Sequence, residues 1–474
     1  MVFSSIIFLL YFLPLVLLAY YFIPKNFKNI LLLMASIFFY WWGAPLFIYV
    51  ILGTTLIDFL LVQKMAKQEN KKLKNALLIL SLSINLSLLF YFKYSNFFID
   101  NFNVVLQSLG MTSVYWTKLV LPIGISFYTF ESITYVVDVY RKVHKPLHNF
   151  WDYQLYILFF PKLIAGPIIR FHQIGDQISD RSLHENDENK LLGFYRFCLG
   201  LAKKVLIANQ LAPLVDLVFK SNISELGTQE AWIGILAFSF QLYFDFSGYS
   251  DMAIGLAKMF GFKFPENFNN PYAAQSISDF WRRWHITLGA WMKNYLYIPL
   301  GGNKVNSEYR IYLNLTLVFL ASGLWHGATW SFVFWGAYHG VLLILERTFL
   351  LKFYTRMGKI PSVLLCFFLV VIGWVFFKVE KLSDAFIFIE RLFSPHQNIH
   401  FVADFHSSFF MALAAIFAFF TLSPSGEKMQ NAIYFNPYNS AKHISMTLTS
   451  IILFVLCVSF IAAADFNPFI YFRF

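Results

Sequence analysis

Two histidines lie in a stretch of the chain that has no charged side chain. Residues 320–340 read LASGLWHGATWSFVFWGAYHG and contain His326 and His339, each followed by glycine. An ionisable ring in such an apolar segment is costly, and it usually faces the interior of a helix bundle and marks a pathway or a reaction centre. Gly323 and Gly327 form a small-xxx-small pair that lets another helix approach closely. We therefore expect a chamber within the membrane around His326.

An imidazole in such a chamber suits proton transfer, because its pKa can lie near neutrality. His326 could act there as a general base, a role typically worth about 10²–10⁴-fold in rate. A metal site on both histidines is disfavoured, since the chain rotates by roughly 220° between His326 and His339 on a continuous helix and they would not share a face. We expect no metal and no bound cofactor.

A second group of candidates lies in the string SISDFWRRWH, residues 276–285. Ser276 followed by Asp279 is a capping-box pattern that starts a helix. Asp279 and Arg283 are four residues apart and can form an ion pair on one helix face. His285 at the end of the string is the second candidate histidine.

Two interpretations of this string remain open. Arg282 and Arg283, together with Lys293, would attract an anionic ligand such as a phosphate group. Alternatively, the segment is an interfacial helix in which His285 is only a polar tip. The tryptophans that would then lie at headgroup level are Trp281, Trp284 and Trp291.

Two carboxylates follow an apolar run in QLYFDFSGYSD, residues 241–251. Buried charges need partners, and we expect Asp245 and Asp251 to stabilise the fold through ion pairs. The alternative is that one carboxylate orients a histidine ring. The expected basic partners are Arg282, Arg283 or Lys293.

The last six residues, FIYFRF, contain Tyr471. Aromatic ends usually anchor at the membrane interface. Tyr471 is also a hydroxyl nucleophile on a chain end that could fold over a chamber. Because an unperturbed tyrosine has a pKa of about 10, it needs a base before it can attack. If the attacked group is a carbonyl, His285, or tryptophan and backbone N–H groups, would stabilise the resulting oxyanion.

The composition predicts an all-α polytopic membrane protein. The chain has 474 residues, of which 58% are hydrophobic and 13% charged, whereas soluble proteins carry about 25% charged residues. Runs of about 20 apolar residues can span a bilayer. The net charge of +11 indicates basic cytoplasmic loops rather than nucleic-acid binding. The charge-free runs are residues 1–24, 29–57, 311–345, 360–377, 405–426 and 444–464.

The basic loops predict a topology. If Lys25 and Lys28, the lysines between Lys64 and Lys74, and Arg141 to Lys145 are cytoplasmic, then Met1 lies outside. The C-terminus would be extracytoplasmic. We expect roughly eleven spans in one domain, residues 1–474. The helices expected from this pattern lie near residues 6–23, 29–43, 45–62, 76–92, 118–139 and 443–464.

The middle of the chain is less regular. Residues 153–170 are broken by prolines and glycine, and residues 176–190 form a polar surface loop. Residues 265–302 are too polar to span the membrane and too aromatic to be free in water. We expect re-entrant or interfacial helices in 153–170 and 265–302, since irregular backbone at membrane depth must be buried or line a cavity. Residues 311–345 are too long for one span and predict two half-helices that meet near His326.

Several strings together resemble one family of membrane enzymes. They are LPIGISFYTFESITYVVDVYR, FFPKLIAGPIIR, YFDFSGYSDMAIG, SISDFWRRWHITL, YIPLGG and GLWHGATWSFVFWGAYHG, in order over residues 120–340. They look like the bacterial branch of the membrane-bound O-acyltransferases, especially the proteins of alginate and peptidoglycan O-acetylation. The resemblance implies that fold, with a central tunnel through the protein.

The resemblance also implies roles for particular residues. His326 matches the family's essential histidine, His285 its supporting histidine, and Tyr471 the C-terminal tyrosine proposed to accept the acyl group. The donor would be acetyl-CoA or another acyl thioester. Donor-binding or tunnel-lining residues would be Arg282, Arg283, Asp245, Asp251 and Trp325.

The function that the resemblance implies is movement of an acetyl group across the bacterial inner membrane for O-acetylation of an extracytoplasmic polysaccharide, alginate or a similar one. An extracytoplasmic partner with a Ser-hydrolase-like domain would finish the transfer. Three alternatives remain open: peptidoglycan O-acetylation, a proton-coupled transporter, and a non-catalytic scaffold for a separate acetylase. Intramembrane Asp and His also mark proton relays, but the chain shows no internal repeat of the kind on which transporters are often built.

Overall fold

The computed structural model describes residues 1–395, 403–463 and 469–470, and all regular elements in these residues are helical. The described chain divides into two compact units. Unit 1 is Met1–Lys190 with Leu256–Pro265, and unit 2 is Leu191–Gly255 with Glu266–Phe474. The single membrane domain over residues 1–474 stays a prediction.

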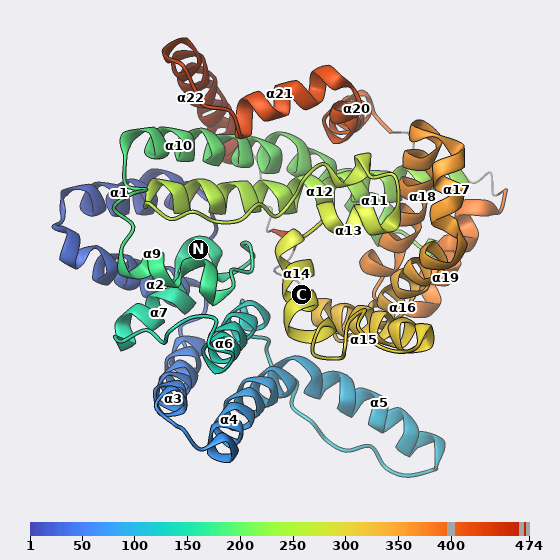
Figure 1. Cartoon of the computed structure of the whole chain (residues 1–474). Helices are drawn as coiled ribbons and strands as arrows, with labels where there is room; N and C mark the ends of the chain where they lie inside the picture. The colour runs from blue at the N-terminus through green and yellow to red at the C-terminus, as the bar shows by residue number, and fades with distance from the viewer. Residues whose placement is uncertain (396–402, 464–468, 471–474) are drawn as a thin grey trace. The chain divides into compact units, whose positions relative to one another are not determined.

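The long apolar helices of unit 1 lie in Phe47–Ala66 and Lys71–Ser108. Helix α3 packs against α4, and both pack against α6, as Figure 1 shows in blue and teal. A π-helical turn, Phe90–Tyr94, joins α4 to α5. The helices are α1 (Leu13–Phe22), α2 (Lys28–Gly43), α3 (Phe47–Ala66), α4 (Lys71–Leu89), α5 (Ser95–Ser108), α6 (Ile125–Tyr140), α7 (Phe150–Leu158), α8 (Phe160–Leu163) and α9 (Phe171–Ser179).

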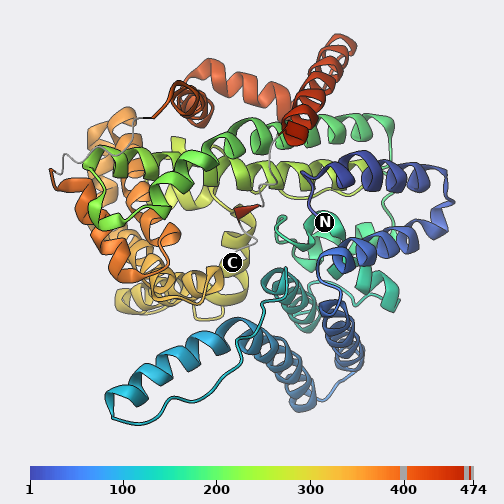
Figure 2. The same cartoon turned by 180° about the vertical axis from the view of Figure 1, so that it is seen from behind.

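Unit 2 contains most of α10 and α12, which begin or end in unit 1, and all the later helices. Helices α15 and α16 lie side by side in both views (Figures 1 and 2), and α16 packs against α18. The helices are α10 (Asp187–Ala202), α11 (Asn209–Lys220), α12 (Thr228–Met259), α13 (Ile277–Arg283), α14 (Ile286–Trp291), α15 (Glu308–His326), α16 (Trp330–Leu345), α17 (Leu351–Met357), α18 (Lys359–Lys378), α19 (Leu382–Phe393), α20 (Phe405–Phe419), α21 (Pro424–Tyr434) and α22 (Ser440–Ala463).

The chain is a multi-pass membrane protein. Within the described residues, five helical segments are long and apolar enough to cross a bilayer. The outer faces of several carry exposed apolar side chains, as on α22, which suits contact with lipid. The rest of the roughly eleven spans stay a prediction. The five segments are Phe47–Ala66, Lys71–Ser108, Lys359–Lys378, Phe405–Leu422 and Ser440–Ala463.

Three predicted boundaries in unit 1 were wrong. The helix expected over 118–139 begins only at Ile125, because Gly124 turns the chain with a φ of 76°. The helix expected over 76–92 is part of a continuous helical stretch, Lys71–Ser108. Nothing in the sequence from Lys71 to Ser108 breaks this stretch. The polar segment 176–190 is a loop only between α9 and α10, because polar residues at both ends extend those helices.

Two predicted breaks are confirmed. Residues 153–170 divide into α7, the single turn α8 and an extended segment before α9. Residues 311–345 divide into α15 and α16, which are separated at Gly327 to Thr329. The second break leaves His326 as the last residue of α15.

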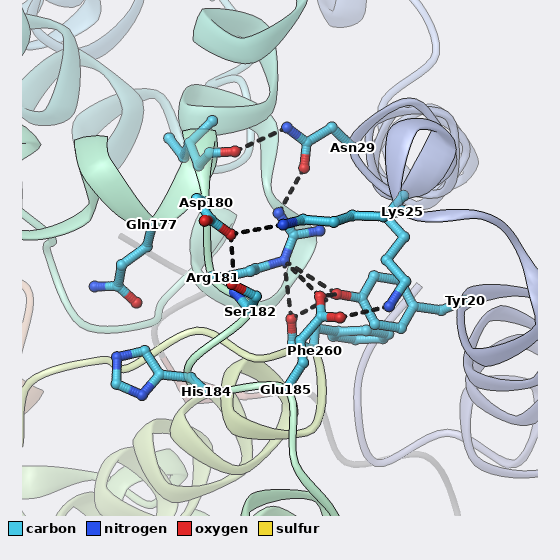
Figure 3. Close-up of polar contacts among 12 residues, drawn as sticks. Tyr20, Lys25, Asn29, Gln177, Asp180, Arg181, Ser182, His184, Glu185 and Phe260 are labelled. Carbon is cyan, nitrogen blue, oxygen red and sulfur yellow. Dashed lines mark hydrogen bonds and ion pairs between the residues drawn. The ribbon is translucent and has the colours of Figure 1, made fainter.

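The α9–α10 loop is attached to the first two helices through Arg181 (Figure 3). The Arg181 side chain is 6% exposed, and its guanidinium donates to the Tyr20 hydroxyl at 3.0 Å and to the Asn29 amide oxygen at 2.7 Å. Glu185 accepts from the Tyr20 hydroxyl and from Lys28 Nζ, the latter at 2.5 Å. Burial alone raises the pKa of Glu185. The hydrogen bonds from Lys28 and Tyr20 lower the pKa by more than this, so it lies below the ordinary value.

We expect Glu185→Gln to destabilise unit 1 by about 1 kcal/mol near neutral pH, because solvent screens this partly exposed ion pair. A lowered folded pKa means that the carboxylate stabilises the fold above the unfolded pKa and that this contribution is lost as the pH falls through the folded pKa. Thermal unfolding in detergent should show a smaller acid-induced drop in the midpoint for the variant than for the native chain.

Asp187→Asn is the matched control. Its carboxyl also has a lowered pKa, through hydrogen bonding to Lys190, but it is exposed to solvent. The midpoint of this variant should follow that of the native chain at every pH. Equal acid sensitivity of the Glu185→Gln variant and the native chain would contradict the assigned role.

Candidate active site

His326 is the last residue of α15, at the turn that leads into the closely packed helix α16. An added Cβ at Gly323 would lie 2.2 Å from the Phe332 carbonyl oxygen, and one at Gly327 would lie 2.3 Å from the Phe332 ring. The predicted close approach at both glycines is therefore confirmed. Because no larger residue fits at Gly323 or Gly327, the end of α15 packs tightly against α16. His326, at this end, is 2% exposed.

Aromatic rings surround the His326 imidazole. Ring centroids of Trp325, Trp335 and Phe377 lie 4.9, 5.0 and 5.1 Å from it. These side chains come from α15, α16 and α18, so three helices of unit 2 form its surroundings. A proton acceptor in so apolar an enclosure meets few competing water molecules, which strengthens electrostatic interactions with a reacting group.

His285 is held by a polar contact rather than by a charge. It precedes α14 with a left-handed φ of 44° and is 1% exposed. Its Nδ1 lies 3.1 Å from the Asn267 Oδ1, which also accepts from the Thr287 hydroxyl at 2.8 Å. Since an amide oxygen only accepts, Nδ1 carries the proton and Nε2 is left as an acceptor. Nε2 has no hydrogen-bond partner among the described residues.

The two predicted histidines come together within unit 2. The Trp325 ring lies 5.9 Å from the His285 ring and 4.9 Å from the His326 ring, centroid to centroid. The indole of Trp325 therefore contacts both imidazoles. Residues 41 positions apart in sequence thus form one cluster, because the α13–α14 segment folds against the end of α15.

The predicted partners of the two aspartates were wrong. Asp245 pairs with Lys204 in the buried π-helical segment Lys203–Ala208. Asp251 pairs with Arg196 and Lys203, both at 2.6 Å. These bases lie on the helix that packs against α12, a proximity that sequence spacing does not reveal. The expectation that both acids are buried in ion pairs is confirmed.

Arg282 and Arg283 pair with Asp279 instead, at 3.5 and 3.0 Å. The predicted Asp279–Arg283 pair and the Ser276 cap are thereby confirmed, the latter by a 3.1 Å hydrogen bond to the Asp279 N–H. The Arg282 side chain is 72% exposed, and Lys293 is also exposed. The interfacial interpretation fails for Trp284 and Trp291, which are buried in protein at 2% and 7% exposure, as is His285.

The described residues of the chain end lie against α12. Phe469 stacks on Tyr249 with centroids 4.7 Å apart, and the Ile470 N–H donates to Asp245 Oδ2 at 2.8 Å. Phe469 also contacts Phe246, whose ring meets His285 edge-on at 4.8 Å. The residues before Tyr471 therefore lie one ring away from His285. Tyr471 itself lies outside the described residues.

Sequence reasoning missed two residues that position this cluster. Asn267, which fixes the His285 tautomer, lies in the string NFNN of the irregular 265–302 segment. Lys203 and Lys204 lie together in an otherwise apolar run, and lysines there were the available signal for nearby acids. Within the part of the chain that the structure describes, no group of His, Cys, Asp and Glu side chains has the geometry of a metal site.

The chain is similar in sequence to several known acyltransferases. The chain is 46% identical over 395 residues to the probable alginate O-acetylase AlgI of Pseudomonas aeruginosa, covering 83% of this chain and 75% of that protein. It is 39% identical over 422 residues to the peptidoglycan O-acetyltransferase of Helicobacter pylori, covering 81% and 78%. It is 29% identical over 246 residues to the teichoic acid D-alanyltransferase of Bacillus subtilis, covering 49% and 60%.

A family model covers both histidines of the cluster and the helices that position them. The match is to MBOAT, the membrane-bound O-acyltransferase family, and it spans residues 72–379. That range contains the α13–α14 segment, the break between α15 and α16, and α18. The chain is a member of the membrane-bound O-acyltransferase family and is an O-acyltransferase.

Proposed function

We propose that this O-acyltransferase moves an acetyl group from a cytoplasmic thioester to an extracytoplasmic polysaccharide, alginate or a similar polymer. The observation that carries the proposal is that two buried imidazoles, His285 and His326, both contact the indole of Trp325. The similarity to alginate O-acetylases over most of the chain supports the choice of polymer.

The reaction needs a base, and His326 supplies it. The imidazole takes the proton of an acceptor hydroxyl while the hydroxyl oxygen bonds to the acyl carbon. The bond between the acyl carbon and sulfur then breaks, and the thiolate takes the proton from the imidazolium. His285 assists by accepting a hydrogen bond at Nε2, because Asn267 holds the other nitrogen protonated.

Tyr471 is the acceptor hydroxyl in this proposal. The support is the position of the two residues before it, Phe469 and Ile470, which contact side chains of α12. The Asp245 carboxylate, paired with Lys204, accepts from the Ile470 N–H, and Phe469 stacks on Tyr249. A tethered nucleophile gains from proximity, which can supply up to about 7–11 kcal/mol of the barrier reduction.

The donor in this proposal is acetyl-CoA or another acyl thioester. Exposed Arg282 is available to an anionic donor from the aqueous side, whereas Asp245 and Asp251 are occupied by ion pairs and act on structure. The membrane is the bacterial inner membrane. An extracytoplasmic Ser-hydrolase-like partner completes transfer to the polymer.

Peptidoglycan is the second candidate acceptor, favoured by the 39% identity to a peptidoglycan O-acetyltransferase. Mass spectrometry of cell-wall and secreted glycans, with and without the gene, separates the two polymers. Loss of acetyl groups from the exopolysaccharide alone supports the first candidate.

We expect His326→Ala to abolish acyl transfer while the protein still inserts and folds. The reason is that the variant loses the proposed base, and a positioned general base is typically worth about 10²–10⁴-fold. The measurement is acetyl transfer from a labelled thioester by purified protein, with melting in detergent as the folding check.

His406→Ala is the control for loss of an imidazole, because His406 lies exposed on α20. Its activity should match that of the native chain. Full activity of the His326→Ala variant would rule out the general-base role.

We expect Tyr471→Phe to remove the covalent acyl adduct from the chain and to stop transfer, because phenylalanine has the ring without the hydroxyl. Intact-mass measurement after incubation with the thioester should show one added acetyl group on the native protein and none on the variant. Tyr438→Phe, which removes a hydroxyl that donates only to the Ile433 carbonyl among described contacts, should retain the adduct. An adduct of undiminished yield on the Tyr471→Phe variant would contradict the assignment.

A further inference from the structure

Three polar rings meet beside His326 in the interior of unit 2. Trp281 of α13 and Trp335 and His339 of α16 contact one another edge to face. The centroid of His339 lies 5.0 Å from that of Trp281 and 5.1 Å from that of Trp335, and the two indoles are 5.5 Å apart. Because Trp335 and His339 are four residues apart, they project from the same face of α16.

The ring nitrogens of this group are buried without hydrogen-bond partners. Among the described residues, no partner contacts Nε1 of Trp281, Nε1 of Trp335 or either nitrogen of His339. Trp335 and His339 are each 0% exposed. A buried donor or acceptor without a partner costs about 1–3 kcal/mol, so rings with only a packing role would be disfavoured here. Unpartnered polar atoms on three rings that contact one another need an explanation, and a bound polar group would satisfy them.

The chemistry of the site is that of a donor cluster without charge. Two indoles each offer one N–H, and the neutral imidazole offers one more N–H and one acceptor. The neighbouring rings are Phe319, Tyr338 and Trp374. These groups can hold an oxygen that accepts two hydrogen bonds, such as a carbonyl oxygen, and would stabilise negative charge that develops on it.

The site is close to the proposed base. The Trp335 ring contacts both the His326 ring, at a centroid distance of 5.0 Å, and the His339 ring, at 5.1 Å. Gly373 of α18 fixes the other side of His339, since an added Cβ there would lie 2.8 Å from Nε2. His339 is therefore packed against α18 and lies one ring away from His326, the proposed base.

Resting on the proposed function, we propose that Trp281, Trp335 and His339 form the oxyanion hole, which binds the acyl carbonyl oxygen of the thioester. When the acceptor oxygen bonds to the acyl carbon, the carbonyl electron pair moves onto this oxygen. The N–H groups then stabilise the negative charge, and the pair returns as the carbon–sulfur bond breaks. His285 is less suited to this role, because its available nitrogen is an acceptor.

The test compares three Trp→Phe variants, each of which keeps a ring and removes an N–H. Trp281→Phe and Trp335→Phe should each lower kcat by about 10²–10³-fold, with KM for acetyl-CoA changed far less, because a donor to the oxyanion acts mainly in the transition state. Trp374→Phe is the matched control. Trp374 is a buried neighbour of Trp335 outside the proposed hole, and its N–H donates to the Tyr272 hydroxyl at 3.2 Å.

Loss of kcat in the first two variants, with native-like kcat for Trp374→Phe and similar melting in detergent, supports the assignment. Native-like kcat in the first two variants overturns it, and so does an equal loss in all three, which would show a packing role. A water molecule as the sole occupant would leave kcat unchanged while melting falls. A native chain without any thioester-dependent transfer would refute the proposed function itself, whereas an active native chain with insensitive Trp variants refutes only the oxyanion hole.

Discussion

Taking an imidazole out of water is the constraint on which unit 2 depends. His285, His326 and His339 are all at most 2% exposed in a chain that crosses a membrane. A buried polar group is tolerated when it has partners or when function requires it. The structure satisfies one nitrogen of His285 through Asn267 and encloses the other two histidines in aromatic rings. The fold thus holds polar rings in place with apolar packing.

Close backbone contact makes that enclosure possible. Gly323 lets the first turn of α16 pass against α15, and Gly336 does the same for the Phe319 carbonyl oxygen, which an added Cβ would approach to 2.3 Å. Because both contacts involve backbone atoms, no side-chain movement could relieve a larger residue at either position. The position of His326 at the end of α15 follows directly from this packing.

The sequence was informative where chemistry and backbone rules act locally. The burial of His326, the Ser276 cap, the Asp279–Arg283 pair and the break after His326 could all be predicted from neighbouring residues. The partners of Asp245 and Asp251 could not, because they depend on how α10 and the segment after it pack against α12. Asn267 was missed for the same reason, since its role arises from a fold that returns to it 18 residues later. The start of α6 was predicted too early because the turn at Gly124 was not recognised.

The most direct test of the account is an experimental structure of the protein with a non-reactive thioester analogue bound, such as the methyl ketone of acetyl-CoA. The account predicts the ketone carbon beside the His326 imidazole and the ketone oxygen directed at the indole N–H groups of Trp281 and Trp335. An analogue bound elsewhere, with His326 enclosed by protein on every side and contacting no part of it, would contradict the account.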